Sequence, residues 1–215
     1  MKVLITGTSY GIGRAICDKF LANGHIVIGI DKCDSTISHK NYTHIKKDIF
    51  YNELPDIDNV EILINNAGVQ LSDDDIDINL KGTIKVTEKY AFNDNIKSVL
   101  FIASSSGRTG SEFPHYVASK GGMIAYMKNI AIRLAKYNAT SNSLSPGGVL
   151  TDLNKHIIED ENLWNKVMDE CLLKKWASTE EIAEFAYFMT VINKSMTAQD
   201  VLVDNGEANN YNFVW

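Results

Sequence analysis

The sequence is poor in residues that cross-link or interrupt a fold, with 3 cysteines and 3 prolines among 215 residues. Cys17, Cys33 and Cys171 are odd in number, widely separated and free of any CxxC spacing. The 5 histidines never pair at the short intervals typical of metal ligands. We therefore expect reduced thiols and no metal site. A chain of this length buries a sizeable core without such cross-links.

Long apolar runs and an excess of positive charge are also missing. No stretch approaches the roughly 18 consecutive apolar residues that a membrane span needs, and the apolar run after Met1 and Lys2 is too short for a signal peptide. The formal net charge is -6 and the pI is about 5.4, without a Lys/Arg cluster that could neutralise phosphates along a nucleic acid. We expect a cytoplasmic protein with neither a membrane nor a nucleic acid as partner.

Internal repeats and Pro/Gly/Ser linkers are absent too, which favours one domain over residues 1–215. Short β-branched apolar runs alternate with stretches of helical period. The runs are 3–5, 26–30, 43–45, 60–64, 99–103 and 201–203, and the helical stretches are 12–22, 78–92, 116–137 and 179–191. Continuous apolar runs are typical of strands buried on both faces. The pattern predicts an α/β fold with a doubly wound, mostly parallel sheet of about seven strands and helices on both faces.

A glycine-rich turn joins the first predicted strand to the first predicted helix. Gly7 allows a tight turn, Gly11 lets the backbone approach a pyrophosphate, and Gly13 lets the helix pack on the strand. The free N–H groups at the start of the helix suit phosphates. Asp31 ends the second strand about twenty residues on, where a carboxylate can accept ribose hydroxyls. A plain turn and a loop carboxylate are the alternatives.

The spacing Gly7-x-x-x-Gly11-x-Gly13 resembles the TGxxxGxG motif of the short-chain dehydrogenase/reductase family, whose domain is a Rossmann-type fold. Further segments resemble the family's motifs in the same order along the whole chain. They are Asp48, Asn65-Asn66-Ala67-Gly68, Asn79, Ser104, the YxASK element from Tyr116 to Lys120, and the PGxVxT element from Pro146 to Thr151. The resemblance implies an NAD(P)-dependent oxidoreductase that interconverts a ketone and a secondary alcohol.

The resemblance also assigns the residues that hold the cofactor. They are Gly7, Ser9, Tyr10, Gly11, Ile12, Gly13, Asp31, Asp48, Asn66, Ala67, Gly68, Tyr116, Lys120, Pro146, Gly147, Val149 and Thr151. An acidic residue in the place of Asp31 resembles the NAD-preferring members, whereas Lys32 beside it resembles the NADP-preferring ones. We expect NAD to be favoured over NADP.

The reduction of a carbonyl group needs a proton donor at the substrate oxygen, and the family resemblance assigns this role to Tyr116. Lys120 lies four positions later, so a helix puts both side chains on one face. A positive charge about 5 Å from the phenol stabilises the phenolate by roughly 3 kcal/mol at an effective dielectric constant near 20. Tyr42 and Lys46 share the spacing, but their surroundings predict a strand, where the pair is too far apart to interact.

The resemblance gives Ser104 the role of stabilising the substrate oxygen and Asn79 that of holding a water in a proton relay, which completes the catalytic set with Tyr116 and Lys120. Ser104 keeps the family's three-residue step to Gly107, and Ser105 remains an alternative. The substrate is a small carbonyl or alcohol compound such as a 3-oxoacyl thioester, sugar or polyol. The alternative function is a non-catalytic dinucleotide-binding regulatory or assembly protein on the same fold.

The chain is compact where it departs from the family, with little room for helices after the second, third and fourth strands. The helix 116–137 is apolar on more than one face, which predicts a homodimer or homotetramer. Lys81, Lys85 and Lys89 favour a solvated face. The segment 152–176 is either a mobile lid over the substrate or a helix packed on the core. The aromatic end 211–215 either docks on the body or reaches a neighbouring subunit.

Overall fold

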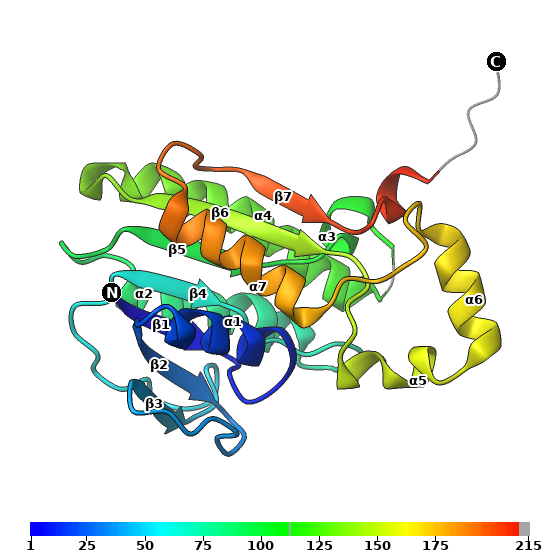
Figure 1. Cartoon of the computed structure of the whole chain (residues 1–215). Helices are drawn as coiled ribbons and strands as arrows, with labels where there is room; N and C mark the ends of the chain where they lie inside the picture. Colours follow the sequence, from blue (N-terminus) through cyan, green and yellow to red (C-terminus); the bar gives the residue numbers. More distant parts are fainter. Residues whose placement is uncertain (112, 211–215) are drawn as a thin grey trace.

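A computed structural model describes residues 1–111 and 113–210 of the chain. Its centre is one parallel sheet of 7 strands in the order β3-β2-β1-β4-β5-β6-β7 (Figure 1). The strands are β1 (Lys2–Thr6), β2 (Ile26–Asp31), β3 (Tyr42–Lys46), β4 (Ile62–Asn65), β5 (Ser98–Ile102), β6 (Thr140–Pro146) and β7 (Asp200–Val203). The chain order reverses between β1 and β4, which makes the sheet doubly wound, as predicted.

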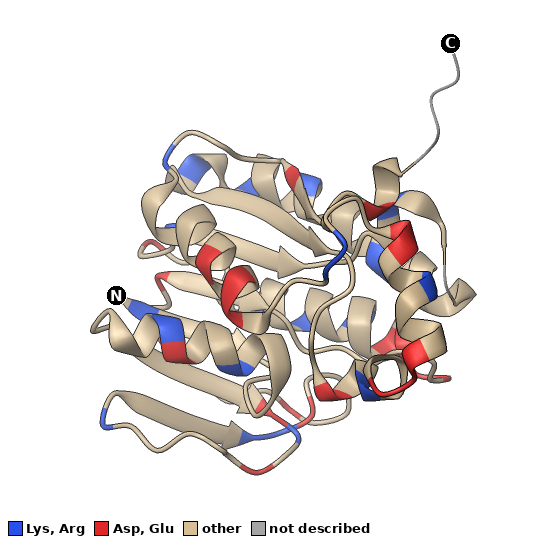
Figure 2. Cartoon of the chain, turned by 45° about the vertical axis from the view of Figure 1, so that its right-hand side comes forward, with Lys and Arg blue, Asp and Glu red and all other residues tan. Residues whose placement is uncertain are grey.

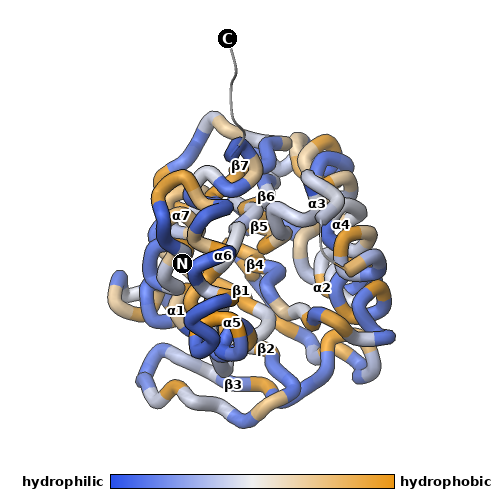
Figure 3. Tube along the Cα trace, turned by 90° about the vertical axis from the view of Figure 1, so that its right-hand side faces the viewer, coloured by the Kyte–Doolittle hydropathy of each residue, from blue (hydrophilic) through white to orange (hydrophobic). Residues whose placement is uncertain are grey.

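Helices cover both faces of the sheet. α1 (Gly11–Ala22) and α7 (Thr179–Tyr187) lie on one face, and α2 (Thr83–Tyr90) and α4 (Pro114–Leu134) lie on the other (Figure 1). Side chains alternate along β1, because Val3 and Ile5 join the core under α1 and α7 while Leu4 joins the core under α2 and α4. Hydrophobic residues accordingly concentrate in the strands at the middle of the molecule (Figure 3).

Shorter elements complete the chain. They are η1 (Ile76–Gly82), α3 (Ser106–Thr109), η2 (Ala135–Tyr137), η3 (Asp152–Asn154), α5 (Lys155–Ile158), α6 (Glu161–Glu170), η4 (Phe188–Ile192) and η5 (Glu207–Asn209). η1 is a π-helical segment that leads directly into α2, so the helical stretch expected from residue 78 begins at Ile76, immediately after three aspartates. Carboxylates suit the positive end of a helix dipole.

The six apolar runs all lie in or beside strands, but the sequence pattern did not identify β6. Its sequence, TSNSLSP, is polar although every residue from Ser141 to Pro146 is buried. The serine hydroxyls find partners inside the protein. Ser141 Oγ donates to the carbonyl oxygen of Met127 at 3.0 Å, and Ser143 Oγ and Ser145 Oγ both donate to Asp200 Oδ1 at 2.6 Å. Buried hydroxyls are tolerated where they are hydrogen-bonded in this way.

The compact segments expected after the second and third strands contain no helix, since the described chain runs from β2 through β3 to β4 as strands and loops. The loop over residues 48–56 contacts the lysines of α2. Lys85 Nζ donates to the carbonyls of Phe50 and Asn52 at 2.9 and 2.7 Å, and Lys89 Nζ donates to Leu54 at 2.6 Å. Lys81 and Lys89 are exposed, as the expected solvated face requires, while Lys85 is half-buried against the loop.

The segment after β6 forms α5 and α6 beside the sheet (Figure 1). Trp164 and Trp176 meet edge to face with ring centroids 5.3 Å apart, and Met168 and Cys171 share their small apolar cluster. α6 thus packs mainly on this cluster and not on the main core. The aromatic end 211–215 lies outside the described residues.

The three cysteines are free thiols, and the described residues hold no cluster of three or more possible metal ligands. No helix in the described part of the chain is long and apolar enough to span a membrane. Acidic and basic residues are interspersed along the ribbon (Figure 2).

Candidate active site

The turn between β1 and α1 has the geometry of a phosphate cradle. Gly7 and Gly11 adopt positive φ angles of 72° and 55°, a conformation that side chains disfavour. A Cβ atom on Gly13 would lie 1.9 Å from the carbonyl oxygen of Gly7, so this close packing of helix on strand requires glycine. Tyr10 precedes α1 and its side chain does not cap the helix, which leaves the first N–H groups of α1 directed at the turn.

Thr6 and Asn66 fasten this turn to the chain that leaves β4. Thr6 Oγ1 accepts hydrogen bonds from the N–H groups of Asn66 and Ala67, both at 3.0 Å. Asn66 Nδ2 in turn donates to the carbonyls of Thr6 and Gly7 at 3.0 and 2.9 Å. The two loops are therefore held together at the point where the order of strands reverses, which is where doubly wound folds bind their ligands.

Asp31 lies at the end of β2, facing the same turn. Its carboxylate accepts the N–H of Ser9 at 2.8 Å on one oxygen and the N–H of Cys33 at 2.9 Å on the other. The two bonds fix the orientation of the carboxylate while leaving lone pairs on each oxygen for a ligand. Asp48 organises the next loop, because its Oδ1 accepts the N–H groups of Phe50 and Tyr51.

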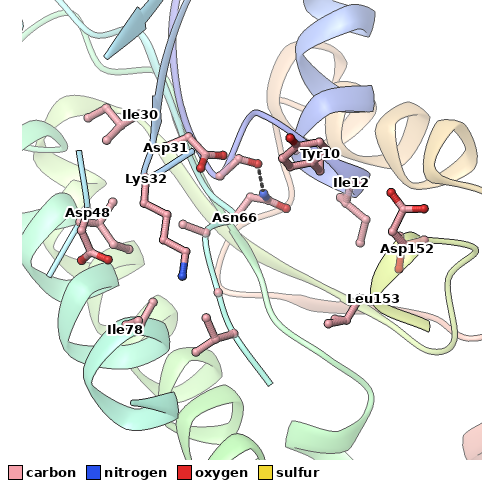
Figure 4. Close-up of a pocket in the computed structure, with 18 of the residues that line it drawn as sticks. Tyr10, Ile12, Ile30, Asp31, Lys32, Asp48, Asn66, Ile78, Asp152 and Leu153 are labelled. Atoms are coloured by element: carbon pink, nitrogen blue, oxygen red, sulfur yellow. Dashed lines mark hydrogen bonds between the residues drawn. The ribbon is translucent and has the colours of Figure 1, made fainter. Parts of the chain in front are cut away.

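A cavity of about 330 Å³ runs along these loops (Figure 4). Lys32 and Asp48 lie at one end of it, and Ile12, Asp152 and Leu153 at the other (Figure 4). The predicted cofactor residues that line it are Gly7, Tyr10, Gly11, Ile12, Gly13, Asp31, Asp48, Asn66, Ala67, Gly68 and Thr151. Its volume and mixed lining are typical of a small-molecule site.

The other predicted cofactor residues do not line this cavity, and Lys120 is connected to it through Gly68, where a Cβ would lie 3.6 Å from Lys120 Nζ. The buried Ser9 contributes its N–H to Asp31, and its own hydroxyl has no hydrogen-bond partner among the described residues. Pro146 ends β6, Gly147 packs against Asp204, and Val149 is buried beside Ala177. The backbone from Pro146 leads directly to Thr151 at the cavity.

Tyr116 and Lys120 share the first turns of α4, as the spacing predicted. Lys120 Nζ lies 5.6 Å from the centre of the Tyr116 ring and donates to the carbonyl oxygen of Ile102 at 2.9 Å. The Lys120 side chain is almost fully buried, and burial lowers its pKa to about 8. The ammonium is therefore a poorly solvated positive charge beside the aromatic ring of Tyr116.

Asn79 joins this group from η1. Its Nδ2 donates to Ser119 Oγ at 3.1 Å and to the carbonyl of Val69 at 2.9 Å, while its Oδ1 accepts the N–H of Val69 at 2.7 Å. A Cβ on Gly68 would lie 3.0 Å from Asn79 Oδ1 and 3.6 Å from Lys120 Nζ. Asn79, Gly68 and Lys120 thus converge on one small volume, although 41 sequence positions separate Asn79 from Lys120.

The serines after β5 are all buried. Ser104 Oγ donates to Ser106 Oγ at 3.0 Å and accepts the N–H of Ser106 at 3.2 Å. Ser105 uses its backbone to bind the carbonyl of Pro146 at 2.8 Å. Gly107 packs directly on the backbone of Lys120, where a Cβ would lie 2.8 Å from the Lys120 carbonyl carbon. The turn carrying Ser104 is therefore seated on the start of α4.

Tyr42 and Lys46 show that the Tyr-x-x-x-Lys spacing alone has no such consequence. Both lie in strand β3, as predicted. The Tyr42 hydroxyl pairs with Thr8 and His44, at 2.8 and 3.0 Å, and Lys46 pairs with the exposed Asp34.

The chain is similar to known proteins over most of its length. A family model described as Enoyl-(Acyl carrier protein) reductase matches residues 47–207. The chain belongs to the short-chain dehydrogenase/reductase family. It is an NAD(P)-dependent oxidoreductase of this family, whose reaction interconverts carbonyl and alcohol groups.

Individual family members resemble the chain over almost its whole length. The chain is 28% identical to a 3-oxoacyl-[acyl-carrier-protein] reductase of Chlamydia pneumoniae, with 95% of this chain and 96% of the relative covered. An L-xylulose reductase of Caenorhabditis elegans is 27% identical, with 97% and 96% covered. The structure of 4-hydroxyisoleucine dehydrogenase complexed with NADH is 25% identical, with a TM-score of 0.88 and 98% and 99% covered.

The residues present fit a nicotinamide dinucleotide of the kind this family uses. A Cβ on Gly7 or Gly13 would collide with atoms of the two loops, a Cβ on Gly11 would lie 3.5 Å from the cavity residue Thr151, and the buried Ser9 hydroxyl has no partner within the described residues. Sequence reasoning missed Thr6 and Ser119, which hold the two loops and Asn79 in place. Thr6 belongs to the TGxxxGxG motif and Ser119 to the YxASK element, but the motifs alone do not reveal the hydrogen bonds that these hydroxyls make.

Proposed function

We propose that Tyr116 is the general acid and base with which this chain interconverts a ketone and a secondary alcohol. Lys120 tunes the phenol, Ser104 stabilises the substrate oxygen, and Asn79 maintains the proton relay. The observation that carries the proposal is the buried Lys120 ammonium lying 5.6 Å from the centre of the Tyr116 ring. Family resemblance adds a second contact of Lys120, with the nicotinamide ribose.

The chemistry follows from these positions. When bound, the nicotinamide dinucleotide supplies or accepts the hydride. Tyr116 donates its proton to the carbonyl oxygen during reduction and takes it back during oxidation. Lys120 stabilises the phenolate that remains, because its charge is poorly screened in the protein interior. Ser104 donates a hydrogen bond to the oxygen as its charge develops, for which its hydroxyl must turn away from Ser106.

The loops of the cavity support the assignment of the cofactor-binding residues. Gly7, Gly11 and the start of α1 would hold the pyrophosphate, and Asp48 would border the adenine. Asp31 favours NAD over NADP, because its fixed carboxylate accepts ribose hydroxyls and repels a 2′-phosphate. Lys32 and Lys47 also line this cavity, and their positive charges would attract a 2′-phosphate. The repulsion by Asp31 is therefore opposed by the attraction of these two lysines.

The substrate is a small carbonyl or alcohol compound of the 3-oxoacyl thioester, sugar or polyol kind. The proposed enzyme is one domain over residues 1–215, acts in the cytoplasm, and forms a homodimer or homotetramer. Association through α4 would bury Ile132, which has 75% of its surface accessible in the single chain.

Nicotinamide absorbance measured with a panel of ketones and alcohols tests the proposal. We expect Tyr116→Phe to lose at least about a hundredfold in kcat, because the proton donor is removed, while cofactor binding persists. Tyr42→Phe is the matched control, since Tyr42 lies in β3 and has the same sequence spacing to a lysine. Normal turnover of Tyr116→Phe would overturn the assignment. A wild-type chain that binds the cofactor and turns over nothing in the panel would favour a regulatory role.

A further inference from the structure

One buried carboxylate near the site has no role in the reaction so far. Asp75 comes immediately before η1 and only 1% of its surface is exposed. Its Oδ1 accepts the N–H of Ser72 at 3.2 Å. A carboxylate removed from water in this way is costly unless a positive charge lies within its reach.

The neighbouring acidic residues have other partners or face solvent. Asp73 is exposed, and Asp74 accepts the hydroxyl of Tyr51 at 2.8 Å. Asp77 pairs with Lys81 at 2.6 Å on the same helix. Asp75 alone among these four aspartates is buried, on the segment that carries Asn79 one turn later.

Lys120 has the complementary problem, because it is a buried cation whose hydrogen-bond acceptor is neutral. Its ammonium donates to the Ile102 carbonyl and lies beside the Tyr116 ring. The other charged groups on the adjoining elements are engaged or exposed, since Arg108 of α3 faces Asp200 at 3.4 Å and His115 of α4 is exposed. The charge of Asp75 acts on Lys120 and raises its pKa against the larger effect of burial.

We propose that Asp75 is the buried counter-charge of Lys120, a positioning residue that keeps the ammonium protonated beside Tyr116. η1 packs against α4 through the hydrogen bond from Asn79 Nδ2 to Ser119 Oγ. Asn79 follows Asp75 by one helical turn and Ser119 directly precedes Lys120, so this bond holds the two segments together. Asp75 acts through the low-dielectric interior and not by an ion-pair contact. The electrostatic coupling between Asp75 and Lys120 is independent of the proposed function. Its effect on catalysis rests on the proposed roles of Tyr116 and Lys120.

The coupling is measured directly by following the 13Cε and 15Nζ signals of Lys120 during a pH titration of the full chain. Asp75→Asn keeps an oxygen for the Ser72 N–H but removes the charge. We expect the pKa of Lys120 to fall by about one unit in this variant, a tenfold rise in the ratio of neutral to protonated lysine at a given pH. Asp77→Asn is the control and leaves the Lys120 titration unchanged. An unchanged pKa in Asp75→Asn would overturn the proposal.

A second measurement covers the case in which Asp75→Asn does not fold. In the wild-type chain, the 13Cγ signal of Asp75 is expected to shift with an inflection at the pKa of Lys120, and to lose that inflection in Lys120→Met. A 13Cγ chemical shift of Asp75 that does not change as Lys120 titrates contradicts the coupling.

Activity separates this inference from the function on which it rests. We expect the high-pH limb of kcat for carbonyl reduction to move to lower pH in Asp75→Asn by the same amount as the Lys120 pKa. If Tyr116→Phe is inactive and Asp75→Asn leaves both the pKa and the limb unchanged, the counter-charge is wrong and the function stands. If Asp75→Asn shifts the Lys120 pKa and Tyr116→Phe turns over normally, the coupling stands and the proton donor is wrong.

Discussion

Lys120 carries a charge that the protein interior makes easy to lose. Burial lowers its pKa to about 8, so its protonated form predominates below that pH and disappears above it. We expect kcat for carbonyl reduction to fall as the pH rises through about 8, because a neutral lysine no longer stabilises the Tyr116 phenolate. A pH profile between about 6 and 10 measures this.

Lys120→Arg provides the comparison for that profile, since a guanidinium stays charged over the whole range. The residual activity of this variant is expected to lack the decline near pH 8. A decline that persists unchanged in Lys120→Arg would assign the limb to another group.

Asp31 offers a second test at the same scale. In Asp31→Asn the amide oxygen can still accept one backbone N–H, but the negative charge at the cavity is gone. We expect the affinity for NADPH relative to NADH to rise about tenfold, which corresponds to about 1.4 kcal/mol of removed repulsion. Fluorescence titration of the two cofactors measures the ratio. Asp34→Asn, on the exposed Asp34 that pairs with Lys46, serves as the control. An equal ratio in wild type and Asp31→Asn would refute the role of Asp31.

The sequence identified residues whose chemistry is distinctive and overlooked those whose role depends on position. Tyr116, Lys120 and Asn79 belong to recognisable motifs, and the helix that carries Tyr116 and Lys120 was predictable from its period. Thr6 begins the glycine-rich motif and Asp75 belongs to none, but both are ordinary residues by type. Their importance arises because β1, β4 and η1 meet in space, and local spacing carries no information about that meeting.

At the level of elements, the loop 48–56 and helix α2 behave as one unit. Lys85 supplies two of the hydrogen bonds that hold the loop, to Phe50 and Asn52. Lys85→Met keeps an unbranched side chain but loses both donors, so we expect about 1–3 kcal/mol of local stability to be lost. Faster amide hydrogen exchange over residues 48–56 and weaker cofactor binding would show it. Lys81→Met should change neither, because Lys81 pairs with Asp77 within its own helix.

Strands were predictable where their residues were apolar and unpredictable where hydrogen bonds replaced hydrophobic contacts. β1 and β5 are buried on both faces and read as continuous apolar runs. β6 is equally buried, but its serines satisfy their hydroxyls through Met127 and Asp200. Those partners lie 14 to 57 positions away, so only the folded chain reveals why a polar segment belongs in the sheet.

For the whole molecule, the proposed association through α4 makes a prediction about size. The chain has a mass of 24.0 kDa, and light scattering is expected to give two or four times that value. Ile132→Lys places a charge on the proposed interface and should reduce the measured mass. Leu173→Lys, at a residue with 66% of its surface exposed elsewhere on the molecule, should leave it unchanged. A wild-type chain that scatters as a single copy contradicts the prediction.

The bonds from Thr6 Oγ1 to the N–H groups of Asn66 and Ala67 have a thermodynamic consequence for cofactor binding. They order, during folding, the two loops proposed to hold the pyrophosphate, through contacts that involve protein atoms alone. The conformational entropy lost in fixing those loops therefore belongs to the folding equilibrium and not to the binding equilibrium. The entropy lost when a dinucleotide binds here is therefore expected to come mainly from the ligand's own translation, rotation and internal torsions.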